Sequence, residues 1–382
     1  MIYLDNSATT RPSAAVMEAV THSMADGWYN PSAIYPPAMQ VRKGINEVRR
    51  ACLHAVRADG ENLYFTSSGT EADNLAILGF LRTLRGGGKV LVFQLEHPAV
   101  LSCMPEIKRM GFQVEEMVPD SRGVLSIEKL KCQLTADVRL ICLMQVHNES
   151  GAIQPIKDVA ALRDALCPNA AIHVDGVQGF LRCPIDFQKL GIQSYAFSGH
   201  KIHALKGIGG LIVRKDHRVN PIMLGGGQES GIRSGTENTA GIAAIGAAVS
   251  AWQEEWSGQM MQLKCKLWRG IHEHIPEATL NGPDMDDTAC APHILNVSLN
   301  PVRSETMLNA LAGAGIMVSA GSACSSHKQK VSSGLISMGV ERSQAESAIR
   351  FSLCPETTED EIETVIEQVV KQWTLLHSYV RR

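Results

Sequence analysis

The sequence lacks a strong charge of either sign. Its 382 residues include 36 lysines and arginines against 39 aspartates and glutamates, which gives a formal net charge of −3. Proteins that hold nucleic acid or an acidic membrane surface through long-range electrostatics usually carry a marked basic excess. We therefore expect no direct nucleic-acid partner and no membrane partner.

Long apolar runs and a regular cysteine pattern are also missing. Although 45% of the residues are hydrophobic, polar residues interrupt every apolar stretch well short of the roughly 20 residues that a membrane span needs. The first six residues show no basic region followed by an apolar segment, so we expect no signal peptide. The ten cysteines are scattered, which favours free, mostly buried thiols in a reducing, cytoplasmic setting.

Strand-like and helix-like segments alternate through the first two thirds of the chain. Strands are expected at 63–66, 89–93, 113–118, 139–146, 171–174, 195–197 and 211–213, and helices between them at 72–84, 99–110, 127–134 and 157–166. This alternation of strands and helices predicts an α/β fold, with a mostly parallel sheet of the seven-stranded type and helices on both faces.

The length of the chain predicts a second, smaller domain. We assign residues 12–250 to the large α/β domain, and residues 1–11 with 251–382 to a small α+β domain. A long helix near Asn238 should run toward His274, with a break near Gly258, and join the two. The last helix should open at Thr357 or Thr358, and a polar loop at 320–333 belongs to the small domain.

Polar clusters follow four of the predicted strands. They are Glu96-His97, His147-Asn148-Glu149, Asp175-Gly176-Val177-Gln178 and Ser198-Gly199-His200-Lys201. Each cluster has a structural explanation by itself, such as a loop histidine, a turn-forming asparagine or an aspartate that caps a helix. Ligands of parallel sheets bind beyond the carboxyl ends of the strands, however, and four such clusters together indicate a functional site.

Lys201 stands at the end of an apolar strand. Desolvation at such a place lowers the pKa of a lysine and makes its neutral amine available for a Schiff base. A solvated loop lysine is the alternative, and Lys206, five residues on, is a second candidate.

The run 66–71, Thr-Ser-Ser-Gly-Thr-Glu, joins a strand to a helix. Ser68 and Glu71 fit a capping box, and the N–H groups of Gly69 and Thr70 with the helix dipole form an anion site. An ordinary capped helix has the same pattern.

These residue types together suit pyridoxal phosphate. A lysine holds the cofactor, a carboxylate keeps the pyridine nitrogen protonated, an imidazole stacks on the ring, and a helix N-terminus with hydroxyls holds the phosphate. Positions 69–71, 97, 148, 175, 178, 198, 200 and 201 supply each part.

Two further residues lie in the small domain. Cys324, beside His327, Lys328 and Lys330 in a polar loop, is placed to be a reactive thiolate, or is an incidental surface thiol. A metal site at Cys324 and His327 lacks a second ligand pair, so we expect no metal. Arg350 could bind a carboxylate with two hydrogen bonds or form a structural ion pair.

Taken together, these motifs resemble the cysteine desulfurases of the NifS/IscS type, in the class-V aminotransferase group of pyridoxal-phosphate enzymes with fold type I. The resemblance extends from residue 3 to residue 353. Its most specific pieces are the runs 66–71, 96–97, 173–178, 198–201, 233–236 and 321–324.

The resemblance implies roles for individual residues. Lys201 would hold the cofactor and move protons, aided by His97, which stacks on the ring. Asp175 would pair with the ring nitrogen and Gln178 would face the ring oxygen. The phosphate would be bound by Gly69, Thr70, Ser198 and His200, and by Thr236 from the partner subunit, which implies a homodimer. Asn148 and Arg350 would bind the substrate carboxylate, and Cys324 would take the sulfur.

The implied reaction converts L-cysteine to L-alanine and leaves a persulfide on Cys324. The loop resembles the long, mobile type that passes sulfur to an acceptor protein, either an iron–sulfur cluster assembly scaffold or a tRNA-thiolation protein. The chain departs from the family at His147, where asparagine is usual, and at Ser230 and Cys354. A selenocysteine lyase, another class-V enzyme such as an aminotransferase, and a catalytically silent sulfur-relay protein remain alternatives.

Overall fold

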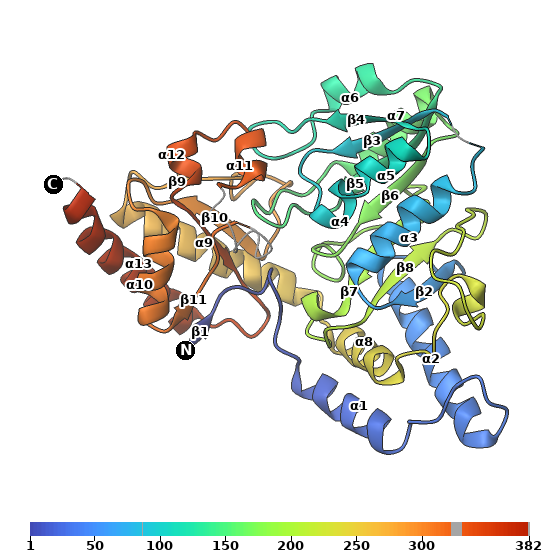
Figure 1. Ribbon diagram of the computed structural model, residues 1–382. Coiled ribbons are helices and arrows are strands. Elements are labelled where there is room, and N and C mark those ends of the chain that lie inside the picture. Colours follow the sequence, from blue (N-terminus) through green and yellow to red (C-terminus); the bar gives the residue numbers. More distant parts are fainter. Residues whose placement is uncertain (86, 322–330, 381–382) are drawn as a thin grey trace.

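The computed structural model describes residues 1–85, 87–321 and 331–380. The chain forms a larger lobe around a central sheet and a smaller lobe that holds both chain ends (Figure 1). None of the helices in these ranges is long and apolar enough to cross a membrane. The nine cysteines they contain are all free thiols, and six of those thiols are buried.

The large lobe is built on a seven-stranded sheet, counted within the described residues. Its strands, in spatial order, are β2 (Asn62–Thr66), β8 (Gly209–Val213), β7 (Ser194–Ser198), β6 (Ala171–Asp175), β5 (Val138–Met144), β3 (Lys89–Phe93) and β4 (Gln113–Met117). Neighbouring strands are parallel except at β8, which is antiparallel to both β2 and β7. The predicted mostly parallel sheet is confirmed.

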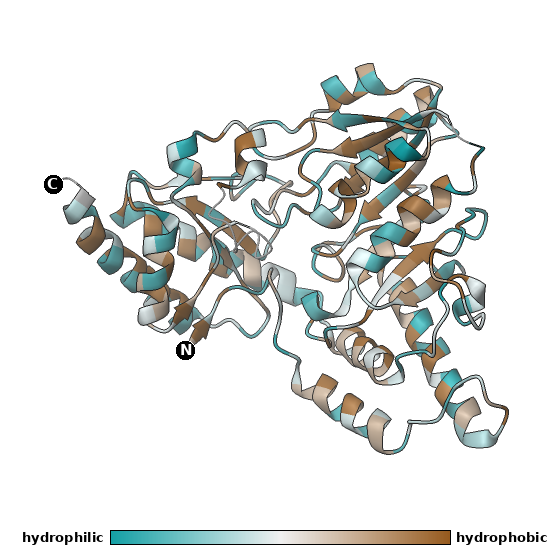
Figure 2. Ribbon diagram, viewed as in Figure 1, coloured by the Kyte–Doolittle hydropathy of each residue, from teal (hydrophilic) through white to brown (hydrophobic). Residues whose placement is uncertain are grey.

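Both faces of this sheet are buried. In β3, Leu91 and Phe93 belong to one apolar cluster, and the alternating Val90 and Val92 belong to another. The first face is covered by α2 (Pro36–Ala55), α6 (Ile127–Gln133), α7 (Ile156–Leu166) and α8 (Thr239–Ala251), with α1 (Ala14–Ala25) against α8. The second is covered by α3 (Gly69–Leu81), α4 (Pro98–Leu101) and α5 (Met104–Arg109). Figure 2 accordingly shows these strands as largely hydrophobic.

The small lobe has a core of its own. Its antiparallel sheet has the order β12 (Ala348–Ser352), β10 (Ile294–Ser298) and β9 (Thr279–Leu280), and β1 (Ile2–Tyr3) pairs in parallel with β11 (Ile316–Met317). The helices are α9 (Glu255–His274), α10 (Ser304–Gly313), α11 (Ser333–Ser337), α12 (Arg342–Ala345) and α13 (Glu359–Val380). The expected α+β architecture is therefore present.

The division of the chain into domains remains our proposal. The buried residues of α8 join the core of the large lobe, whereas those of α9 join the core of the small lobe. A boundary near residue 250 follows from this change, and the pairing of residues 2–3 with β11 attaches the N-terminus to the small lobe.

Two predicted helices are interrupted at places that the sequence did not indicate. The helix from Asn238 breaks at 252–254 and not near Gly258, because Trp252 takes an extended conformation and packs against the core of the small lobe. The segment 99–110 divides into α4 and α5, with Pro105 accommodated in the first turn of the second helix. The last helix opens as expected, with Thr358 and Glu361 in a reciprocal capping box.

Candidate active site

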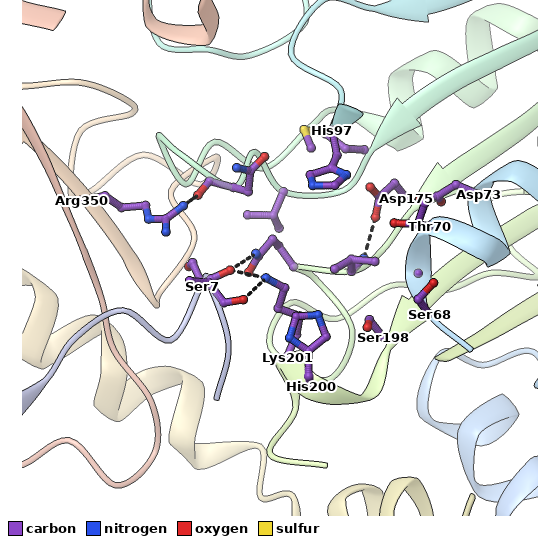
Figure 3. A pocket seen from close by; sticks show the side chains of 17 residues that line it. Ser7, Ser68, Thr70, Asp73, His97, Asp175, Ser198, His200, Lys201 and Arg350 are labelled. Carbon is purple, nitrogen blue, oxygen red and sulfur yellow. Dashed lines mark hydrogen bonds between the residues drawn. The ribbon is translucent and has the colours of Figure 1, made fainter. Parts of the chain in front are cut away.

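A pocket of about 250 Å³ lies where the carboxyl ends of β5, β6 and β7 meet the small lobe (Figure 3). It is lined by Ser7, Ala8, Ser68, Gly69, Thr70, Asp73, His97, Met144, Val146, Asn148, Asp175, Val177, Gln178, Ser198, His200, Lys201 and Arg350. Of the predicted site residues that the structure describes, all but Thr236 are in this lining. Cys324 lies outside the described residues.

Lys201 ends the short 3₁₀ turn, Gly199–Lys201, that follows β7. Its Nζ donates hydrogen bonds to the main-chain oxygens of Ser7 and Ala8, the latter at 2.8 Å. Lys206 is exposed and does not line the pocket. The fold therefore favours Lys201 over Lys206 as the lysine of the site.

Asp175 is the last residue of β6 and is only 4% exposed. Its Oδ1 accepts a 2.9 Å hydrogen bond from the Val177 N–H, which fixes the carboxyl group. Burial raises the pKa of Asp175, while the nearby His97 and Lys201 act in the opposite direction. A cationic group in the pocket would favour the ionised form of this carboxyl group.

His97 caps the N-terminus of α4. Its Nδ1 accepts a hydrogen bond from the Ala99 N–H at 3.1 Å, so a neutral ring carries its proton on Nε2. Burial lowers the pKa of His97, with Lys201 acting in the same direction and Asp175 against it. The residue is thus both a satisfied capping histidine and part of the pocket wall (Figure 3).

The N-terminus of α3 forms one end of the pocket. Ser68 Oγ accepts a hydrogen bond from the Glu71 N–H at 3.1 Å, as a capping box predicts, but the reciprocal contact differs. The Glu71 carboxylate binds the Ser67 N–H at 2.7 Å and Arg233 Nε at 2.8 Å. At Gly69 an added Cβ would lie 2.6 Å from a methyl carbon of Val177, so a glycine is needed for this close approach.

Ser198 and His200 belong to the same end of the pocket as the N-terminus of α3. Figure 3 shows Ser198 beside Ser68 and Thr70, at the opposite end of the pocket from Arg350. His200 Nδ1 lies 3.2 Å from Thr9 Oγ1. Burial, with Lys201 as the next cause, lowers the pKa of His200 to about 4, so its imidazole is neutral near pH 7.

Arg350 on β12 forms the other end and is 1% exposed. Its Nη1 donates to the main-chain oxygen of Asn148 at 2.8 Å, and its Nη2 donates to Asp5 Oδ1 at 2.9 Å. Within the described residues its buried Nε has no hydrogen-bond partner. The ion pair considered as an alternative is therefore present, and a donor remains for a ligand.

The residues of the pocket fit pyridoxal phosphate. Besides Arg350 Nε, the buried Ser7 Oγ lacks a partner among the described residues, so the pocket offers unsatisfied polar atoms as well as space. A lysine, a buried carboxyl group, a neutral imidazole and an open helix N-terminus surround one cavity. The described residues contain no group of three or more acidic, histidine or cysteine side chains that could hold a metal ion.

Two buried arrangements behind the pocket were not predicted from the sequence. The His173 Nε2 lies 3.1 Å from Asp73 Oδ1, and its Nδ1 lies 2.9 Å from Ser194 Oγ. Arg182 donates to Gln178 Oε1 at 3.2 Å and also to the main-chain oxygen of Lys201. The His173–Asp73 contact joins positions 100 residues apart, for which the linear sequence offers no signal.

The predicted roles of Gln178, Thr236 and Cys324 stay predictions. Gln178 lines the pocket, but its Nε2 donates to Ser7 O at 3.0 Å, and its contact with a cofactor oxygen stays a prediction. Thr236 is exposed and outside the lining, and its place in a partner subunit's site stays a prediction. Cys324 lies outside the described residues.

The chain matches the family model described as aminotransferase class-V over residues 2–365. The chain belongs to the class-V aminotransferase family.

Several relatives of the chain are named cysteine desulfurases. The chain is 38% identical over 381 residues to the cysteine desulfurase IscS of Pectobacterium carotovorum, covering 97% of this chain and 92% of the relative. Among solved structures, a NifS-like protein superposes with a TM-score of 0.91 at 31% identity, over 98% of this chain and 100% of that one. The structure titled SspA in complex with cysteine gives a TM-score of 0.80 at 27% identity, over 94% and 100%.

Proposed function

We propose that this class-V aminotransferase family member is a pyridoxal-phosphate-dependent cysteine desulfurase. The observation that carries the proposal is the arrangement of one pocket with a helix N-terminus at one end, Arg350 at the other and Lys201 between them, and with Asp175 in its wall. Its relatives are named cysteine desulfurases, and the similar SspA structure is titled as a complex with cysteine.

The pocket residues have distinct places around the proposed cofactor. The α3 N-terminus with Gly69, Thr70, Ser198 and His200 would hold the phosphate, because unpaired N–H groups and hydroxyls bind anions. When bound, pyridoxal phosphate supplies an electrophilic carbon and a ring that withdraws electrons from the α-carbon of the substrate. Asp175 would hold the proton of the ring nitrogen.

Lys201 and His97 serve proton transfer and orientation in this proposal. The carbonyl oxygens of Ser7 and Ala8 hold Lys201 Nζ at the pocket, where it can carry a proton to and from the substrate carbons. The neutral His97 ring, fixed by Ala99, would lie against the cofactor ring.

The substrate carboxylate would bind at Arg350 and Asn148. Arg350 is held by Asn148 O and Asp5, and its free Nε can donate to a carboxylate. The same contacts orient Asn148 next to it. The amino group of a bound amino acid would then point toward Lys201.

Sulfur transfer is assigned to Cys324. Its thiolate would attack the sulfur of the bound L-cysteine, the carbon–sulfur bond would break, and a sulfur–sulfur bond would form. The substrate carbon would gain a proton, so that one L-cysteine and one thiol give one L-alanine and one persulfide. The persulfide sulfur would then pass to an acceptor protein or be reduced to sulfide. A homodimer, with Thr236 reaching the partner's site, belongs to the same proposal.

The test is the formation of alanine and sulfide from L-cysteine by the cofactor-loaded protein with a thiol reductant. Equal amounts of the two products, abolished by Cys324→Ala with the cofactor absorbance retained, would support the proposal. Faster turnover of selenocysteine would point to a lyase for that amino acid, and activity that survives Cys324→Ala would point to another class-V reaction. A protein that takes up no pyridoxal phosphate would contradict all three.

A further inference from the structure

Both ends of the segment that carries Cys324 rest on the carboxylate end of the pocket. On the N-terminal side, Ser319 pairs with Arg350 through two main-chain hydrogen bonds. The Arg350 N–H donates to Ser319 O at 2.7 Å, and the Ser319 N–H donates to Arg350 O at 3.2 Å. The strand that presents the Arg350 side chain to the pocket therefore also holds the entry to this segment.

On the C-terminal side, the contact is made by Glu149. Ser332 Oγ donates a hydrogen bond to Glu149 Oε2, and the same Oγ accepts the Leu335 N–H at 3.1 Å as the cap of α11. At Gly334 an added Cβ would lie 3.2 Å from His147 Nε2, so the start of α11 packs directly on His147. The exit of the segment is thus held by the turn that contains Asn148.

This turn is itself rigidly held. His147 Nδ1 lies 2.8 Å from Ser150 Oγ, and Asn296 Nδ2 donates to Glu149 O at 3.2 Å. Arg350 Nη1 binds Asn148 O, as described above. A continuous set of contacts therefore runs from Ser319 through Arg350 and the turn to Ser332, and Glu149 is 8% exposed within it.

We propose that Glu149 is a positioning residue for sulfur transfer. Its carboxylate fixes Ser332, and so sets the C-terminal end of the Cys324 segment at a defined place relative to Asn148 and Arg350. Releasing Ser332 would leave the attachment at the start of α11 less fixed relative to Asn148 and Arg350. A less fixed attachment lowers the effective concentration of the Cys324 thiol at the substrate sulfur. This inference rests on the proposed desulfurase function.

The contact between Glu149 and Ser332 can be tested with four single variants and one double variant of the cofactor-loaded protein. Glu149→Ala removes the acceptor, Glu149→Gln keeps an oxygen that can accept from Ser332, and Ser332→Ala removes the donor. Ser333→Ala is the matched control, because Ser333 is exposed and neighbours the tested serine. The double variant Glu149→Ala/Ser332→Ala measures whether the two side chains act together.

Two quantities separate positioning from binding. The first is the single-turnover rate of persulfide formation on Cys324, and the second is the dissociation constant for L-cysteine from the change in cofactor absorbance. We expect Glu149→Ala and Ser332→Ala each to slow persulfide formation about tenfold, while the dissociation constant changes less than about twofold. The double variant should be no slower than the slower single one, and Glu149→Gln should recover most of the rate.

A third readout needs no turnover. Hydrogen exchange at the Ile336 and Met338 amides, which bond to Ser332 O and Gly334 O, should become faster in Glu149→Ala and remain unchanged in Glu149→Gln and Ser333→Ala. Unchanged hydrogen exchange together with a normal rate of persulfide formation in Glu149→Ala would overturn the inference. It would also be overturned if the rate reductions of the two single variants multiplied in the double variant. If Glu149→Ala does not fold, the rate of persulfide formation in Ser332→Ala decides whether the inference holds.

Failure of the proposed function can be distinguished from failure of the inference about Glu149. A wild-type protein that forms no persulfide from L-cysteine would contradict the desulfurase proposal, whatever the variants do. The hydrogen-exchange comparison would then still decide whether Glu149 anchors Ser332.

Discussion

Arg350 Nη1 donates a 2.8 Å hydrogen bond to the main-chain oxygen of Asn148, and this contact joins the small lobe to the large lobe at the pocket. Arg350 comes from β12, whereas Asn148 follows β5 of the large sheet. The two residues proposed for the substrate carboxylate therefore orient each other before any substrate arrives.

Replacing Arg350 by lysine should weaken substrate binding without removing the cofactor. Lysine keeps a positive charge but loses the planar group that binds Asn148, Asp5 and a ligand at once. We expect the dissociation constant for L-cysteine to rise about 10- to 100-fold, as measured by titration of the cofactor absorbance. Arg342→Ala, which removes an exposed arginine of α12, is the control and should bind normally. An unchanged constant in Arg350→Lys would contradict the assignment.

Lys201 should be the lysine that holds the cofactor. Borohydride reduction, which makes a lysine–cofactor link permanent, followed by peptide mapping should place the label on Lys201. Lys201→Ala should lose the label, and Lys206→Ala should keep it, because Lys206 is exposed and outside the pocket lining. A label on Lys206 would overturn the assignment.

Asp73 and His173 should behave as a neutral pair. Burial raises the pKa of Asp73 and lowers the pKa of His173 to about 3, so burial acts against a charge on both side chains of this 3.1 Å contact. Asp73→Ala should lower the free energy of unfolding by about 1–3 kcal/mol, because it leaves His173 Nε2 buried without a partner.

Asp73→Asn distinguishes this pair from an ion pair. An amide can still donate to the ring, so its cost in urea unfolding should be clearly smaller than that of Asp73→Ala. Equal costs for both variants would indicate a charged pair instead.

His147 should make the protein less stable in mild acid. Burial, and secondarily Arg350, lowers the pKa of His147 from about 6.5 to about 3. His147 is therefore protonated more readily in the unfolded state than in the folded state. Its contribution to the free energy of unfolding is full above pH 6.5 and is lost as the pH falls toward 3.

The variant His147→Asn removes this titration. Between pH 7.5 and 5.5 the wild type should lose about 1.4 kcal/mol more unfolding free energy than the variant, since other groups contribute equally to both. Urea unfolding at the two pH values measures the difference. Parallel losses in both proteins would show that His147 is not held neutral by the fold.

The sequence was sufficient for the parts of the site that lie within single motifs. Lys201, Asp175 and His97 could be found because each follows an apolar strand, and parallel strands bring their carboxyl ends to one edge. The cap at Ser68 was predicted too, but the partner of Glu71 was not, because Arg233 approaches it from 162 positions away. Local pattern carries no information about such contacts.

Contacts between distant segments account for the other differences. The N-terminal residues Ser7 and Ala8 reach Lys201 across more than 190 positions, and Asp73 reaches His173 across 100. The helix break at Trp252 depends on packing against the core of the small lobe, so the flexible Gly258 was a misleading signal. In each case tertiary packing overrides the local propensity.

The most direct test of the account is a single turnover of the cofactor-loaded protein with L-cysteine and no reductant, followed by product analysis and mapping of the cysteines. We expect one alanine per site and a persulfide on Cys324. Both should be lost in Cys324→Ala and retained in Cys132→Ala, which removes an exposed cysteine of α6. Alanine formed at the wild-type rate by Cys324→Ala, or a persulfide mapped to another cysteine, would contradict it.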